Sequence, residues 1–251
     1  MTIDPIEQFQ LPNFFKIGQI GDHTIYFTSS SAYMVLAVVL TLVLMIGGVT
    51  GAKLVPGRFQ SMTEITYEFV ATMVRSTAGS EGMKFFPLVF SIFMFICVSN
   101  LVGVIPYSFT ISSHLIVTAT LALMVFFTVL TYGFYKNGLK FFKIFVPSGI
   151  PIAILPLVVF IEIFSFFLRP VSHSVRLFAN MLAGHIALKV FAGFVAMLGV
   201  SLGAIGWIGG IAPLALTIAL AALELLVAFL QAYVFAVLTC IYLNDAIHPG
   251  H

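Results

Sequence analysis

Charged side chains are scarce in this sequence. Asp, Glu, Lys and Arg make up 8% of its 251 residues, and 61% of the residues are hydrophobic. Soluble domains carry about 25% charged residues, so a soluble globular fold is excluded and the composition is typical of an integral membrane protein. The only cysteines, Cys97 and Cys240, lie far apart in apolar segments and form no metal or redox motif. We interpret them as small packing residues.

Motifs for enzymatic chemistry are missing as well. The chain contains no nucleotide-binding loop, no zinc-ligand spacing and no nucleophile elbow. We therefore expect no catalytic residue, no metal, no cofactor and no nucleic-acid partner. The N-terminus carries Asp4 and Glu7 and lacks the basic segment of a cleaved signal peptide, so none is expected.

Long apolar runs predict an all-α integral membrane protein with a single membrane domain over residues 1–251. Residues 1–28 form an outer N-terminal segment in this scheme. Five runs are long enough to cross a bilayer, which takes about 20 residues. The predicted membrane helices cover residues 31–50, 85–105, 115–135, 157–199 and 214–243. Residues 58–79 instead repeat apolar side chains every three or four positions, which predicts an amphipathic helix on the membrane surface or against a neighbour.

Basic residues gather on one side of the membrane in this arrangement. Two loops on that side hold seven of the eleven Lys and Arg residues: Lys53, Arg58, Arg75, Lys84, Lys136, Lys140 and Lys143. By the positive-inside rule this side is cytoplasmic, or the matrix if the chain is organellar. The N-terminus is then outside and the C-terminus inside.

One segment places arginines, histidines and an asparagine in sequence that is otherwise apolar enough for lipid. It runs from Arg169 to His185. Ionisable groups in a bilayer are costly and usually face a partner or a water-filled path. The alternative is a helix end at the headgroups, where arginine can snorkel. That alternative stays open for Arg169 and is disfavoured for Arg176, because lipid-compatible sequence continues on both sides of Arg176.

The helix that carries this segment and the last helix are predicted to form an antiparallel hairpin, with a glycine-rich turn near residue 203. Polar residues on the two helices then match in level. The expected pairs are Glu162 with Asp245, Arg176 with Gln231, and His185 with Glu224. The 37 steps from Glu162 to Gly199 span about 55 Å of helix, against a hydrocarbon core of about 30 Å. We therefore expect a strongly tilted hairpin.

Two interpretations of these polar pairs are possible. Titratable groups at both ends, with a fixed cation between them, suit a proton route that does not run straight through the membrane. Alternatively, buried ion pairs hold the helices together. The second interpretation explains His185 with Glu224, but it leaves Arg176 facing a neutral glutamine. An unpaired guanidinium implies an anion from another subunit.

The motif RLFANMLAGH at residues 176–185 is highly specific. With Glu224 and LQAY at 230–233 downstream, it resembles subunit a of F-type rotary ATP synthases. The resemblance covers essentially the whole chain, including NLVGVIP at 100–106. It implies a non-catalytic proton-translocating subunit, in which Arg176 is the stator arginine. Two offset aqueous half-channels would load and unload the carboxylates of a rotating ring.

The resemblance also implies roles for further residues in proton translocation. His185 and Glu224 would line the outer half-channel, and Glu162 and Asp245 the inner one. In many bacterial members the position of His185 holds a carboxylate and the position of Glu224 holds a histidine. Mitochondrial-type members share the order found here. The residues next to Arg176 would be Gln231 on the last helix and Asn180 on the same helical face.

The implied partners are a ring of small hairpin rotor subunits, the membrane subunits of a peripheral stalk, the lipid bilayer and, indirectly, a soluble catalytic head. The implied location is a bacterial inner membrane, with the mitochondrial inner membrane as the alternative. A stand-alone transporter with a midplane polar site is disfavoured by the lack of internal repeats and by the unpaired Arg176. A purely structural anchor would not need matched titratable groups.

Overall fold

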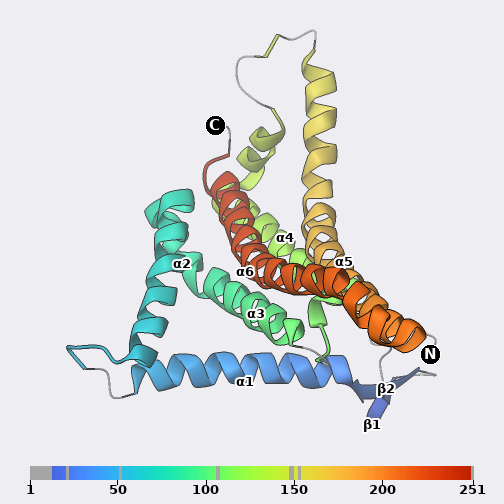
Figure 1. The fold of residues 1–251 in the computed structure, drawn as a ribbon. Coiled ribbons are helices and arrows are strands. Elements are labelled where there is room, and N and C mark those ends of the chain that lie inside the picture. Colours follow the sequence, from blue (N-terminus) through green and yellow to red (C-terminus); the bar gives the residue numbers. More distant parts are fainter. Residues whose placement is uncertain are drawn as a thin grey trace. The chain divides into compact units, whose positions relative to one another are not determined.

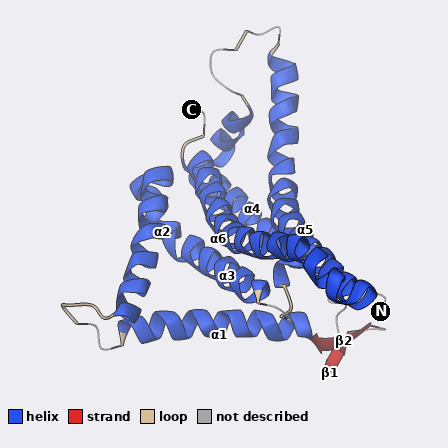
Figure 2. Ribbon diagram, viewed as in Figure 1, coloured by secondary structure: helices blue, strands red, loops and turns tan. Residues whose placement is uncertain are grey.

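Helices dominate the fold (Figures 1 and 2). The computed structural model describes residues 13–20, 23–50, 53–105, 108–146, 150–151 and 154–249. Among them, five helices are long and apolar enough to cross a membrane. The predicted class, an all-α multi-pass membrane protein, is confirmed. Three residues used in the sequence predictions lie outside the described ones: Asp4, Glu7 and Pro106.

The chain folds into two compact units, each assembled from three separate segments. The first unit contains Met1–Leu40, Ile96–His114 and Leu177–Gln231, and the second contains Thr41–Phe95, Leu115–Arg176 and Ala232–His251. The two long C-terminal helices contribute to both units.

A short antiparallel sheet precedes the first helix. Strands β1 (Asn13–Ile20) and β2 (His23–Thr28) pair along their length, with Lys16 opposite Tyr26. The sequence predicted an outer segment over residues 1–28 without strands. The difference has a local cause, since aromatic and β-branched residues favour strands but a stretch this short gives little periodicity to detect.

Helix α1 (Ser29–Val49) is followed by the amphipathic helix α2 (Arg58–Gly82). Mostly small and β-branched side chains, together with Met73, form the packed side of α2: Thr63, Val70, Ala71, Met73, Val74 and Ala78. Four of the five apolar residues whose spacing predicted this helix are instead exposed: Phe59, Met62, Ile65 and Phe69. Phe69 nevertheless contacts Phe93 and Tyr233, with ring centroids 5.9 and 5.7 Å apart, so the placement of this helix on the membrane surface or against a neighbour stays a prediction.

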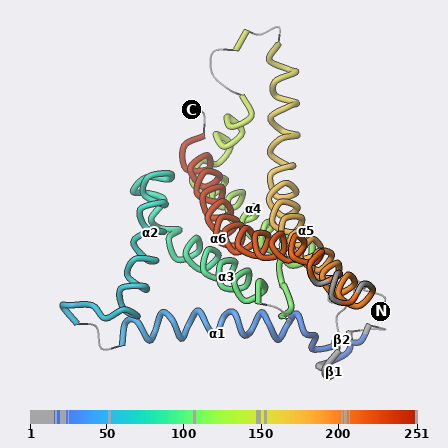
Figure 3. The backbone as a smooth tube through the Cα atoms, in the orientation of Figure 1, coloured from blue at the N-terminus to red at the C-terminus, as the bar shows by residue number. Residues whose placement is uncertain are grey.

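The middle of the chain forms two membrane helices joined by a polar connection. After η2 (Met83–Phe85), α3 (Phe86–Val104) leads through η3 (Ile111–Ser113) into α4 (Leu115–Asn137) (Figure 3). The lysine-rich loop that follows α4 is the 3-10 helix η4 (Gly138–Phe145).

Helix α4 and η4 pack closely because of one glycine. A Cβ atom at Gly133 would lie only 2.3 Å from Cε2 of Phe141, so any other residue would displace the phenyl ring. Gly138 begins η4 with φ of 52°, a left-handed conformation that glycine adopts without strain. Next to it, Asn137 Nδ2 donates to the carbonyl of Ala246 at 2.7 Å, which holds the end of α4 to the C-terminal segment.

Two long helices complete the chain, α5 (Leu155–Gly209) and α6 (Ile211–Ile247), and they are joined at Gly210 (Figure 1). The sequence predicted an end of α5 at residue 199, because glycines follow at close spacing. The structure continues α5 past them, with one non-helical residue at Gly203. A glycine weakens a helix by only about 1 kcal/mol, which tertiary packing offsets.

The apolar part of α5 is unusually long. Its 47 residues, Leu155–Ser201, correspond to about 70 Å of helix, more than twice the roughly 30 Å of a hydrocarbon core. The strongly tilted course stays a prediction that this length supports.

Small residues let α6 approach its neighbours closely. Four side chains at intervals of four are completely buried: Ala228, Ala232, Ala236 and Cys240. Such small residues are typical of packed membrane helices, because they bring backbones together. Cys240 and Cys97 are both free and buried, which agrees with their interpretation as packing residues.

Candidate functional site

In the first unit, α5 and α6 bring together a histidine and a glutamate from positions 39 residues apart. The Nδ1 atom of His185 lies 3.3 Å from Oε1 of Glu224. Both residues are buried, at 8% and 5% exposure. The distance suits an ion pair, yet neither carboxylate oxygen accepts a hydrogen bond from the described residues. A buried carboxylate in this state needs water or a proton, because an unsatisfied charge is costly.

Close packing between these helices positions the glutamate. A Cβ atom at Gly184 would lie 3.1 Å from Glu224 Oε1, so the missing side chain leaves room for the carboxylate. One turn away on each helix, Met181 and Ala228 are completely buried. The predicted antiparallel register is therefore found at this level, and His185 and Glu224 are neighbours as predicted.

Asn100 on α3 also belongs to this polar region. Its side chain is completely buried, and its Nδ2 donates to the Ala228 carbonyl at 3.2 Å. Its Oδ1 accepts a hydrogen bond from Ser112 in η3. Asn100 therefore makes a hydrogen bond from one helix to another, as buried asparagines in membrane bundles do.

The connection between α3 and α4 contributes a residue that sequence reasoning missed. Thr110 Oγ1 lies 2.6 Å from Nε2 of His185, so the two ring nitrogens of this histidine face two different partners. The signal in the sequence was the four hydroxyl residues within positions 108–113. They indicate a turn, but they do not indicate which residues the turn contacts. His114 follows, stacked on Phe109 with ring centroids 4.9 Å apart, and burial lowers the pKa of His114.

The second unit contains a different kind of polar site. Nη1 of Arg169 donates to Oδ2 of Asp245 at 2.8 Å. The guanidinium also lies 4.9 Å from the ring centroid of Tyr242 and 5.3 Å from that of Phe166. Cation–π contacts of this kind add to the ion pair. Arg169 is therefore held within the chain, and no snorkelling position is needed to explain it.

The sequence predicted Glu162 as the partner of Asp245. Among the described residues Glu162 forms no ion pair, and Asp245 binds Arg169 instead. Side chains on a helix lean toward its N-terminus. On antiparallel helices, Arg169 and Asp245 therefore lean toward each other, which brings together two residues whose backbones are offset along the axis.

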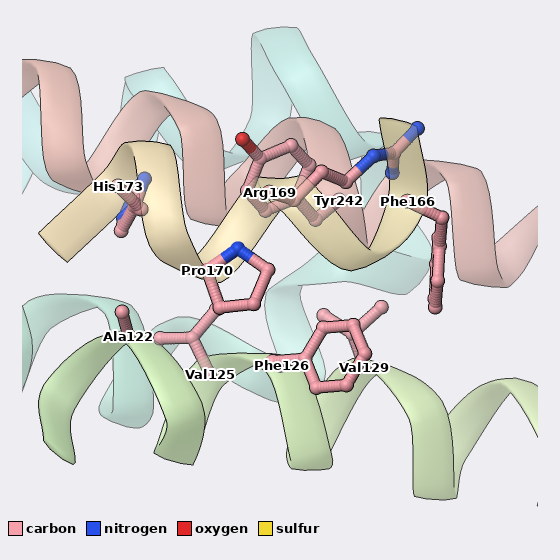
Figure 4. Close-up of a pocket in the computed structure, with 9 residues that line it drawn as sticks. All are labelled: Ala122, Val125, Phe126, Val129, Phe166, Arg169, Pro170, His173 and Tyr242. Carbon is pink, nitrogen blue, oxygen red and sulfur yellow. The ribbon is translucent and has the colours of Figure 1, made fainter. Parts of the chain in front are cut away.

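A pocket lies beside this ion pair, between α4, α5 and α6 (Figure 4). Its polar members are Arg169, His173 and Tyr242, and the rest of its lining is apolar. His173 is 3% exposed, and neither of its ring nitrogens has a hydrogen-bond partner among the described residues. Its ring centroid is 3.7 Å from that of Phe235. His173 was part of the polar segment in the sequence, but no pattern indicated its role.

Arg176 contrasts with these residues. It lies 21 residues after the start and 25 before the end of the apolar span Leu155–Ser201, and it is exposed. Among the described residues of its unit it forms no hydrogen bond or ion pair. Asn180, one turn later, is also exposed, whereas Gln231 on α6 is buried at 7% exposure. The pairing of Arg176 with Gln231 stays a prediction.

No metal centre accompanies these sites in the part of the chain that the structure describes, since no three His, Cys, Asp or Glu side chains come together there. The described residues instead offer a buried carboxylate beside a histidine, and two arginines of which one has an ion-pair partner.

Comparison with known proteins is consistent with these polar sites. The family model described as ATP synthase A chain matches residues 31–244. The chain is 76% identical to ATP synthase subunit a of Bradyrhizobium diazoefficiens and 73% identical to that of Rhodopseudomonas palustris strain HaA2. Each match covers the full length of this chain and of the relative. It is 72% identical to ATP synthase subunit a of Nitrobacter winogradskyi over 99% of this chain and 100% of the relative. The chain therefore belongs to the ATP synthase A chain family.

Proposed function

We propose that this chain is the non-catalytic, proton-translocating subunit of the membrane sector of an ATP synthase. The single observation that carries the proposal is Arg176, which is exposed near the middle of an apolar span and has no anion among the described residues of its unit. A guanidinium in lipid is costly unless it meets an anion. The proposed anion is a carboxylate on each subunit of a small-hairpin rotor ring.

The chemistry follows from the permanence of this charge. A guanidinium does not lose its proton at working pH. When a protonated rotor carboxylate arrives next to it, the positive charge lowers the carboxyl pKa and the proton is released. The carboxylate takes up a proton again after it has passed the arginine. Rotation then proceeds only as protons flow, and the fixed cation blocks direct hopping between the two sides.

Two separate polar regions support two proton routes. The outer route uses His185 and Glu224, which lie 3.3 Å apart and are buried. The inner route uses Glu162 and Asp245. Asn180 and Gln231 complete the surroundings of Arg176 in this scheme. In this scheme a proton crosses from one route to the other only on the rotor.

The same proposal sets the partners and the location. The chain would contact the rotor ring and the membrane subunits of the peripheral stalk, and through them act on the soluble catalytic head. It would lie in a bacterial inner membrane, with its N-terminus outside and its C-terminus in the cytoplasm, as the distribution of basic residues favours.

The test is Arg176→Ala in the assembled complex. ATP-driven proton uptake into sealed inverted vesicles should be abolished, while copurification of the complex is retained, because the substitution removes the charge and not a packing contact. Passive proton leak should persist or rise. Arg75→Ala, at an exposed arginine of α2, serves as the matched control and should pump normally. Normal pumping by the Arg176→Ala complex would refute the proposal.

A further inference from the structure

The contact between Thr110 and His185 joins two residues that are 75 positions apart in the sequence. Thr110 is 4% exposed, and its hydroxyl oxygen is 2.6 Å from Nε2. A short hydrogen bond between two buried side chains fixes the ring plane. The other ring nitrogen, Nδ1, is then directed at Glu224.

The connection holds Thr110 in place through its own hydrogen bonds. Ser113 Oγ donates to the Thr110 carbonyl at 2.6 Å, and Ser108 Oγ donates to the Val102 carbonyl at 2.5 Å. Gly103 approaches the threonine so closely that a Cβ atom there would lie 2.9 Å from Cγ2 and 3.0 Å from Oγ1 of Thr110. The threonine side chain therefore packs against α3 in addition to contacting the histidine.

These contacts favour one tautomer of the neutral ring, the one in which Nε2 carries the proton. Thr110 Oγ1 donates its own proton to the Gly103 carbonyl at 3.4 Å. The same oxygen then accepts a hydrogen bond from Nε2–H of His185. Nδ1 is left with a lone pair that faces Glu224 Oε1, so a proton on the carboxyl group can pass to Nδ1, leaving a carboxylate and an imidazolium. The reverse transfer restores both neutral groups.

We propose that Thr110 is a positioning residue for His185: it holds the tautomer and the ring orientation in which Nδ1 exchanges a proton with Glu224. The inference rests on the proposed function, because this exchange matters only if His185 and Glu224 belong to a proton route. Thr110 itself carries no proton through the site. Among the described residues, the other charged group that acts on the ring is Lys189, one turn later on α5.

The experiment compares Thr110→Val with Thr110→Ser in the assembled complex in membrane vesicles. Valine keeps the shape and removes the hydroxyl, whereas serine keeps it. The readout is the rate of ATP synthesis as the pH on the outer side is varied. Thr110→Val should slow synthesis by about two- to tenfold, the worth of one hydrogen bond, and shift its dependence on outer pH. Thr110→Ser should restore both.

A matched control separates positioning from packing. Thr118 is completely buried, and its hydroxyl donates only to the Leu115 carbonyl of its own helix in the described contacts. Thr118→Val should leave the pH profile unchanged. An unchanged rate and profile in Thr110→Val, or an equal loss in Thr118→Val, would overturn the inference.

A second variant reaches the same contact from the other side. Gly103→Ala introduces a Cβ atom that pushes the threonine side chain, and it should shift the pH profile in the same direction as Thr110→Val. Combined with Thr110→Val, Gly103→Ala should change the rate and the pH profile little further, because the effects of substitutions at interacting positions are not additive. Full additivity would overturn the inference even if one variant assembles poorly.

Glu224→Gln distinguishes failure of this inference from failure of the proposed function. If Glu224→Gln slows synthesis and Thr110→Val does not, the outer route stands and the positioning role is wrong. If neither variant changes the rate or its pH dependence, His185 and Glu224 form a structural contact, and both proposals fail at this site.

Discussion

Arg169 and Arg176 lie two turns apart on the same helix, yet their surroundings differ completely. Arg169 donates to Asp245 and lies over two aromatic rings. Arg176 is exposed and unpaired among the described residues of its unit. A charge that a chain neutralises itself is a structural element of that chain. A charge left without a partner in an apolar span indicates a partner outside the chain.

The most direct test of this difference keeps the positive charge and changes the shape of the group that carries it. Arg176→Lys should reduce ATP-driven proton pumping by more than about tenfold, since lysine cannot present two parallel donors to a carboxylate and charged hydrogen bonds contribute about 1.5–3 kcal/mol each. Pumping is followed by the quenching of a pH-sensitive dye in vesicles.

Arg169→Lys is the comparison for that variant. The structure gives Arg169 one hydrogen bond to Asp245, which an ammonium group can replace, so this variant should keep more than half of the activity. Equal losses at the two positions would mean that the two arginines do not differ in role.

The carboxylates of Glu224 and Asp245 offer a second comparison. Glu224 is buried and accepts no hydrogen bond from the described residues, whereas Asp245 is held by Arg169. Glu224→Gln keeps the size and removes the titrating group. It should slow ATP synthesis by about tenfold, which is less than the roughly 10²–10⁴-fold by which loss of an acid–base group slows a chemical step, and change its dependence on outer pH. A normal profile would make Glu224 a packing residue.

The smallest effect is expected for the stability of the ion pair itself. The side chains of Arg169 and Asp245 are 22% and 31% exposed, so solvent screens their attraction. Asp245→Asn should lower the midpoint of thermal dissociation of the complex by about 2–4 °C. Lys136→Ala, which breaks the more exposed pair with Glu81, should leave the midpoint unchanged. A larger shift at Lys136 would reverse this ranking.

Sequence periodicity and run length predicted the helices, because lipid requires long apolar segments. The same reasoning predicted that His185 and Glu224 are neighbours, since matched levels on antiparallel helices depend only on counting residues. Residue counting also paired Asp245 with Glu162. It did so because it ignores the direction and the length of side chains such as that of Arg169. Thr110 was missed for another reason: the path of a turn is not periodic, so nothing in the sequence indicates what it contacts.

The exposed Arg176 has a consequence for how the protein is made. An arginine at the centre of a membrane helix costs about 2.5–3.5 kcal/mol on insertion scales, which corresponds to a factor of roughly a hundred in an equilibrium. In the proposed assembly this cost is removed only when a rotor carboxylate arrives. A newly inserted copy is therefore less stable than an assembled one, and its survival in the membrane depends on how soon its partners are synthesised beside it.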